Sequence, residues 1–144
     1  MKEEQKLWNF MSTLIVALLI LIVLVVTFWM VYPYKVAEFK NIPFPIVNEN
    51  SEVKRGDRIR YEIDYCKYTE DTPMLTKYFV DGVVFGTPKS PSVVPIGCGK
   101  IISDAYVPKA LPAGEYSLEI IAEYKVNPIR TIQFINYTQQ FIVK

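Results

Sequence analysis

The chain has 144 residues, 51% of them hydrophobic, and its 16 basic and 15 acidic residues give a formal net charge of +1. This balance gives no reason to expect a nucleic-acid partner. Because the chain contains no histidine, it lacks Ser-His-Asp and Cys-His catalysis and the usual imidazole ligands of zinc and copper. No catalytic residue, metal site or cofactor is predicted.

The first predicted element is a membrane anchor helix over residues 7–32, a run without a single charge that follows a short tail, residues 1–6. As a helix the run is about 39 Å long, whereas the hydrocarbon layer of a bilayer needs about 20 residues. Trp8 at one end and Trp29 and Tyr32 at the other suit the membrane interface. A buried helix of a soluble protein is the alternative, but such a helix rarely lacks a polar face over this length.

The run is predicted to be an uncleaved signal-anchor rather than a cleaved signal peptide. Its apolar core is longer than that of a signal peptide, and Lys35 and Ala37 make a poor small-x-small cleavage site. The Lys and Arg residues that flank the two ends are equal in number, so they do not set the orientation. A short tail before an N-terminal anchor favours a cytoplasmic N-terminus, with the C-terminal domain at the cell surface or in the periplasm.

A connector with several prolines is expected over residues 33–50, and a β domain over residues 51–144. The connector is either a stiff stalk or an edge strand that opens the domain. In the domain, Arg58–Tyr65 alternates strictly between apolar and charged residues, which is typical of a half-buried strand. The basic cluster around this strand is interpreted as a solvated strand edge, with lipid headgroup contact as the alternative; it consists of Lys54, Arg55, Arg58 and Arg60.

Further strands follow at short intervals, with an Asp81-Gly82 hairpin turn between the first two. They are expected at residues 74–80, 83–86, 101–107 and 115–126, and then at residues 131–144 as one strand or as two broken near Asn136. A long excursion with several prolines, residues 87–99, separates the hairpin from the next strand. Short strands at this spacing indicate an all-β, antiparallel β-sandwich, here preceded by one transmembrane helix.

The segment Leu111–Leu118 and the closing Gln140–Val143 resemble the turn, penultimate strand and last strand of immunoglobulin-like and fibronectin-type domains. The resemblance implies an immunoglobulin-like sandwich in which Tyr116 bonds back to the preceding turn and supports the fold. The buried Trp of true immunoglobulin domains is absent, because both tryptophans lie in the anchor. The two cysteines also do not have the inter-sheet spacing of that family.

Cys66 and Cys98 are candidates for a disulfide, two free thiols or, remotely, a metal or redox site. Two loops are candidates for partner binding because loops carry function on sandwich scaffolds. One loop contains Asn127 and Arg130, and the other contains Gly97 and Gly99. A weak N-glycosylation pattern begins at Asn136.

These features predict a single-pass, membrane-anchored, extracytoplasmic module that binds a protein and contacts the lipid bilayer through its helix. The alternative is a small accessory structural subunit of a larger membrane or envelope complex, which resembles small membrane proteins of bacteria and their phages. An enzyme is the remote third possibility, because the usual catalytic constellations are missing.

Overall fold

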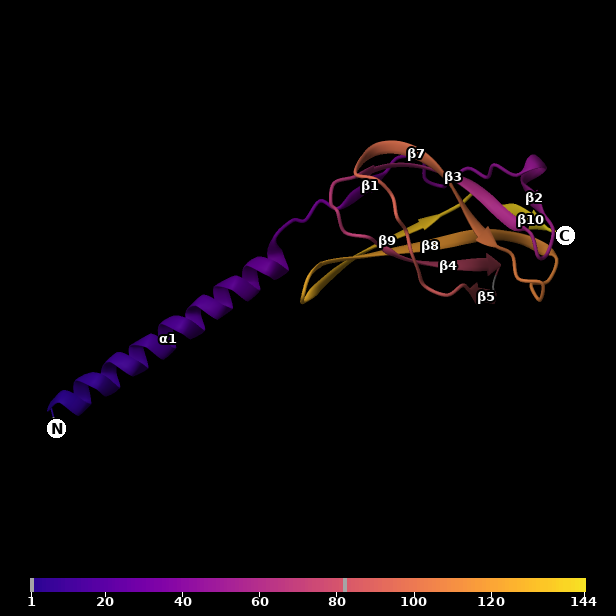
Figure 1. Ribbon diagram of the computed structural model, residues 1–144. Helices are drawn as coiled ribbons and strands as arrows, with labels where there is room; N and C mark the ends of the chain where they lie inside the picture. The colour runs from indigo at the N-terminus through magenta and orange to yellow at the C-terminus, as the bar shows by residue number, and fades with distance from the viewer. Residues whose placement is uncertain (1, 82) are drawn as a thin grey trace. The chain divides into compact units, whose positions relative to one another are not determined.

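The computed structural model describes residues 2–81 and 83–144. It divides into two compact units, one of Met1–Tyr34 with Asn127–Arg130 and one of Lys35–Val126 with Thr131–Lys144. The first unit is built on helix α1 (Lys2–Val31). The second contains the strands, except for Asn127 and Arg130, which are the end residues of two consecutive strands and belong to the first unit. The predicted fold class is confirmed at the level of a β-sandwich preceded by one apolar helix (Figure 1).

Helix α1 passes the length and composition test for a membrane span over Glu3–Val31, and the side chains of that span are not buried within the protein. An N-terminal signal sequence passes the same test. The helix starts at Lys2 and takes in the residues that were predicted as a separate tail. Glu3 and Glu4 lie in its first turn, where carboxylates are favoured by the positive end of the helix dipole.

The sandwich has two sheets, which Figure 1 shows as two layers. The first has the order β1-β3-β7, and the second has the order β2-β10-β8-β4-β5, with β6 on β4 and β9 on β8. The strands of the first sheet are β1 (Ala37–Phe39), β3 (Arg58–Lys67) and β7 (Gly97–Tyr106). Those of the second are β2 (Glu52–Val53), β4 (Met74–Asp81), β5 (Val83–Gly86), β6 (Ser90–Pro91), β8 (Gly114–Asn127), β9 (Arg130–Tyr137) and β10 (Phe141–Val143).

Strand β3 organises the first sheet because it pairs on both sides. It is antiparallel to β7 over ten consecutive residue pairs, from Arg58↔Tyr106 to Lys67↔Gly97, and to β1 near its C-terminal end. The alternation seen in the sequence is realised, since Ile59 and Tyr61 have no exposed surface while Arg58 and Arg60 are exposed. Across the gap, Leu118 and Phe79 of the second sheet are also fully buried, so apolar residues of both inner faces form one core.

The pairing of the strands decides between the predicted alternatives and corrects one boundary. The connector is an edge strand rather than a stalk, because β1 pairs with β3 and Phe44 is buried in the core. The last segment forms two strands that break between Tyr137 and Phe141, close to Asn136 as predicted. The excursion is shorter than predicted and ends at residue 96, since β7 begins at Gly97 rather than at residue 101. Gly82, one of the two predicted hairpin-turn residues, lies outside the described residues, but Asp81 and Val83 pair as expected on either side of it.

The predicted disulfide is confirmed and joins Cys66 to Cys98, which are register partners on β3 and β7. Tyr116 also takes its expected role, since its hydroxyl donates to the carbonyl of Pro112 at 3.1 Å. That bond links the start of β8 to the turn before it.

Tyr61 is a polar group inside the apolar core. Its hydroxyl is buried and makes no hydrogen bond. Burial raises the pKa of the Tyr61 phenol to about 12, and the neighbouring Ser103 offsets this only in part. A hydroxyl without a partner contributes nothing to stability and costs its desolvation.

We expect Tyr61→Phe to keep or increase stability at neutral pH and to change its dependence on alkaline pH. The unfolded phenol ionises near pH 10 and the folded one near pH 12, so the folded state retains its proton longer and loses stability as the pH rises through this window. The loss is about 2–3 kcal/mol. Chemical denaturation of the wild type and the variant at pH 9 and pH 11.5 measures it; an equal decline in both proteins would contradict the assignment.

Removal of the disulfide in a Cys66→Ala, Cys98→Ala double variant is expected to lower the free energy of unfolding by about 3–4 kcal/mol, because a loop of this length is no longer constrained in the unfolded chain. Denaturation of the full chain in micelles, followed by near-UV circular dichroism of the tyrosines, gives the value. The wild type with reductant should match the double variant, and a double variant as stable as the oxidised wild type would refute the expectation.

Candidate functional site

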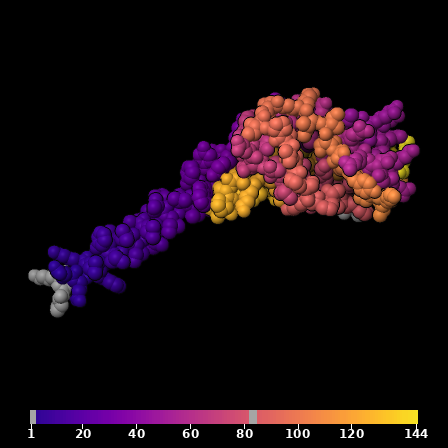
Figure 2. All heavy atoms as spheres, in the orientation of Figure 1, coloured from indigo at the N-terminus to yellow at the C-terminus, as the bar shows by residue number. Residues whose placement is uncertain are grey.

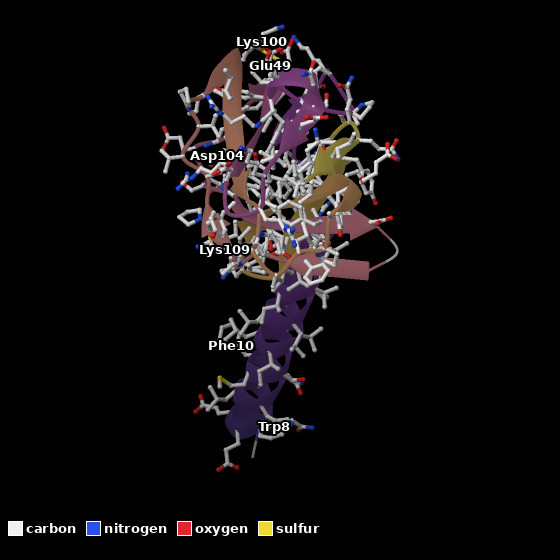
Figure 3. All side chains as sticks on the ribbon, turned by 90° about the vertical axis from the view of Figure 1, so that its right-hand side faces the viewer. Trp8, Phe10, Glu49, Lys100, Asp104 and Lys109 are labelled. Carbon is white, nitrogen blue, oxygen red and sulfur yellow. A yellow bond between two sulfur atoms is a disulfide. The ribbon has the colours of Figure 1, made fainter. Side chains whose placement is uncertain are left out.

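One end of the sandwich carries a groove of about 830 Å³, which we call the charged groove. It lies where β2, the 3₁₀ turn η1 (Glu49–Ser51), the start of β3 and the end of the chain meet. Figure 3 looks onto this end of the sandwich, with Glu49 and Asp104 labelled. Its lining consists of Asn48, Glu49, Asn50, Glu52, Val53, Lys54, Asp57, Arg58, Arg60, Asp104 and Lys144.

One wall of the groove is held to β3 by the side chain of Asn48. Its Oδ1 accepts from the backbone N–H of Arg60 at 2.6 Å, and its Nδ2 donates to the carbonyl of Arg58 at 3.2 Å. The amide thus replaces a neighbouring strand along the edge of β3 at this point. The chain then turns sharply through Asn50, whose φ is 53°, in the left-handed region that Asn tolerates better than most residues.

The opposite wall is formed by the last residue and by the turn that leads into β3. Lys144 donates its backbone N–H to the carbonyl of Val53 at 2.9 Å, and its ammonium forms an ion pair with Glu52. Gly56, with φ of 90°, allows the tight turn after β2. Residues from three distant parts of the chain therefore meet in this groove.

The groove has no net charge, because its four basic side chains balance its four acidic ones. Arg58 pairs with Asp104 at 2.9 Å and Lys144 pairs with Glu52, both with exposed side chains on the basic partner. The neighbouring Asp104 raises the pKa of Arg58, but solvent screens such exposed pairs and they add little stability. Lys54, Arg60, Glu49 and Asp57 have no ion pair among the described residues.

A second hollow lies between the two sheets and is almost entirely apolar. It is lined by residues such as Phe39, Ile63 and Ile120, but its volume is only about 40 Å³. Small-molecule sites occupy about 300–1,000 Å³, so this cavity is a packing defect the size of a few waters. Lys67 reaches over it and donates from Nζ to the carbonyl of Val94 at 3.0 Å.

The structure places the two predicted binding loops in different surroundings. Asn127 and Arg130 belong to the helical unit: the Asn127 amide donates to the carbonyl of Trp29 at 3.0 Å, and the Arg130 guanidinium donates to those of Met30 and Tyr32 at 2.8 and 2.7 Å. They satisfy carbonyls that a helix leaves unpaired at its C-terminal end.

Gly97 and Gly99 are not in a loop, because both lie on strand β7 around the disulfide. Asn136 is only 5% exposed, so the folded domain does not present it for glycosylation, and this prediction does not fit the structure. Of the predicted interface residues, Trp8 is 76% exposed on the helix and Tyr32 follows its last turn with 45% exposed; Trp29 is half-buried.

The sequence indicated part of the groove through its basic cluster, since Lys54, Arg58 and Arg60 line it. Asp104, the acidic partner of Arg58, was missed because it is far away in the chain, and the pair of Glu52 with Lys144 was missed because neither residue stands in a pattern of its own. Asn48 was missed as well, although an Asn shortly before a strand is a common signal for side-chain bonds to the backbone.

No family model matches the chain, and no curated protein is similar to it. Among solved structures, the chain is similar to the crystal structure of a Niemann-Pick type C2 protein from the Japanese carpenter ant. The two share 15% sequence identity over 78% of this chain and 96% of that chain, with a TM-score of 0.48. The class of this protein, a β-sandwich preceded by an apolar helix, follows from the strand pairing given above.

We expect Asn48→Ala to loosen the wall of the groove by about 1–2 kcal/mol, because two hydrogen bonds to β3 are lost. Hydrogen exchange of the Arg60 backbone amide should become faster, since that amide loses its only partner side chain. The Phe79 amide in β4, on the other sheet, serves as an internal control and should keep its protection. Unchanged exchange at Arg60 would show that Asn48 does not hold this wall.

Proposed function

We propose that this chain is a single-pass membrane protein whose β-sandwich lies outside the cytoplasm and binds a protein partner at the charged groove. The groove carries this proposal, because its lining is polar and mixed in charge. Sites for small molecules are mostly apolar, whereas a patch with both signs of charge suits electrostatic complementarity to another protein. Its neutral balance does not favour nucleic acid.

The position of the groove on the sandwich supports this role. The chain enters the sandwich at Lys35, close to β1, and β1 pairs with the Cys66–Lys67 end of β3. The groove lies at the other end of that strand, around Arg58 and Arg60, about 30 Å away along ten residues. A partner bound there lies at the opposite end of β3 from the residue at which the chain enters the sandwich.

The disulfide supports the extracytoplasmic placement, because structural disulfides persist in oxidising compartments. The uncharged run of helix α1 from Leu7 to Val31, which is not buried within the protein, supports an anchor that remains attached. Binding rather than catalysis is proposed because the sequence contains no histidine and the groove holds no nucleophile activated by a neighbouring base.

A second candidate, an accessory subunit whose helix packs against another helix in the bilayer, is favoured by one observation. A shallow hollow of about 170 Å³ lies on one face of α1. It is lined by Trp8, Met11, Ser12, Ile15 and Val16, at the spacing of residues that meet a neighbouring helix.

A photo-crosslinking amino acid placed at Glu49 tests the binding proposal in the cells that express the protein. A discrete adduct is expected at Glu49 and not at Glu70, an exposed control in the loop after β3. Charge reversal by Lys54→Glu with Arg60→Glu should weaken the adduct at least fivefold, whereas Lys125→Glu, an exposed lysine on β8, should not. An adduct at both positions, or none at Glu49, would reject the groove as the binding site. A separate crosslinker placed at Trp8 tests the second candidate, and an adduct from Trp8 alone would favour the accessory subunit.

The placement of the domain is tested separately by thiol labelling of intact cells with a membrane-impermeant reagent. Labelling of Cys66 and Cys98 is expected only after reduction, because the disulfide blocks both sulfurs. Labelling that requires permeabilised cells would place the sandwich in the cytoplasm.

A further inference from the structure

A smaller hollow of about 300 Å³ opens beside the charged groove, between the end of β7 and the segment that follows β5. We call it the Lys77 pocket. It shares Arg58 and Asp104 with the groove, so their ion pair forms the ridge between the two. Figure 2 shows the salmon and orange atoms of the segments around residues 80–106 gathered on the visible face of the sandwich.

Lys77 occupies an unusual position for a lysine. Lys77 is two residues from both Leu75 and Phe79 on β4, so the three side chains share one face of the strand. Phe79 is fully buried in the core, so this is the inner face of the sheet, and Lys77 lies on it. Its ammonium crosses to the other sheet, where it donates to the backbone carbonyl of Asp104 and lies 5.6 Å from the centre of the Tyr61 ring. The side chain is half-buried.

The ammonium is incompletely satisfied in this position. It has three N–H donors, and one of them bonds to the backbone carbonyl of Asp104; it makes no other hydrogen bond to the described residues. The nearby carboxylate of Asp104 is bonded to Arg58 at 2.9 Å. Burial lowers the pKa of the Lys77 ammonium, an effect that the Asp104 charge opposes and the Arg58 charge reinforces.

From these contacts we infer that the Lys77 pocket binds a carboxylate group. The ammonium offers two N–H donors to a ligand at a site partly shielded from water, where an ionic hydrogen bond is stronger than in open solvent. The three charged side chains of the pocket, Arg58, Lys77 and Asp104, sum to +1, which matches one carboxylate better than a dianionic phosphate. The pocket is large enough for a small ligand body, with Pro88, Tyr106 and Pro108 as apolar walls and Ser90 as a hydroxyl donor.

The carboxylate has two possible sources, a free organic acid or the C-terminus of a polypeptide, and the test separates them. The full chain in detergent micelles is titrated with benzoate and with benzamide, its neutral isostere, while the Lys77 side chain is followed by NMR of ¹³C-labelled lysine. Inorganic phosphate forms a third arm. A fourth arm uses an acetylated Gly-Ala-Phe peptide with a free C-terminus, compared with its C-terminal amide.

Benzoate or the free-acid peptide is expected to shift the Lys77 signal saturably and to raise the pKa of its ammonium, because a bound anion favours the charged form. The neutral isosteres should have at least a tenfold weaker effect. The acid that binds is also expected to raise the melting temperature of the wild type. Lys77→Met should abolish this rise, whereas Lys125→Met, at an exposed lysine on β8, should retain it. Tighter binding of phosphate, equal effects of acid and amide, or no saturable shift with any acid would overturn the inference.

The comparison of acid with amide is made on the wild-type protein, so a misfolded Lys77 variant does not decide the outcome. The inference is independent of the proposed function. Failure of carboxylate binding leaves the crosslink at Glu49 unaffected, and a missing crosslink leaves the benzoate titration valid.

Discussion

The pairing of β3 with β7 is the constraint on which the rest of the sandwich depends. Ten residue pairs in register place Ile59, Tyr61, Ile63 and Tyr65 of β3 in the core, while Arg58 and Arg60 between them stay exposed. A shift of one residue would move Ile59 and Tyr61 to the solvent and bring Arg58 and Arg60 into the apolar interior, which is prohibitively costly. The Cys66–Cys98 disulfide joins two partners of that same register, so it is compatible with this pairing alone.

The two polar hollows follow from this register. Because Arg58 faces solvent at the start of β3 and pairs across to the end of β7, its guanidinium meets Asp104 and divides the charged groove from the Lys77 pocket. The groove is exposed and neutral in sum, so the protein partner that we propose for it would gain specificity there more than binding energy. The pocket is smaller and partly shielded, so its one incompletely bonded ammonium dominates its chemistry.

Local patterns in the sequence were sufficient for the elements with a clear period. The alternation in Arg58–Tyr65, the pairing of Asp81 with Val83 in a hairpin and the long apolar helix all follow the local pattern. Prediction failed where a segment takes its conformation from a distant partner. Gly97-Cys98-Gly99 has the composition of a loop, yet β3 recruits it as a strand. Asn127 and Arg130 do flank a turn between two long strands, as predicted, but no local pattern indicated that their side chains bond to carbonyls about one hundred residues earlier in the chain.

The sequence by itself determined the class of the protein, an apolar helix followed by an antiparallel β domain, because hydrophobic period is a local property of a few neighbouring residues. It also limited the chemistry, since a chain without histidine lacks the commonest catalytic base. Only the tertiary structure decided where charged groups meet. The groove combines Asn48, Asp104 and Lys144, and Lys77 reaches across to Asp104. Such contacts depend on which strands pair and in which register, and no stretch of the sequence read alone contains that information.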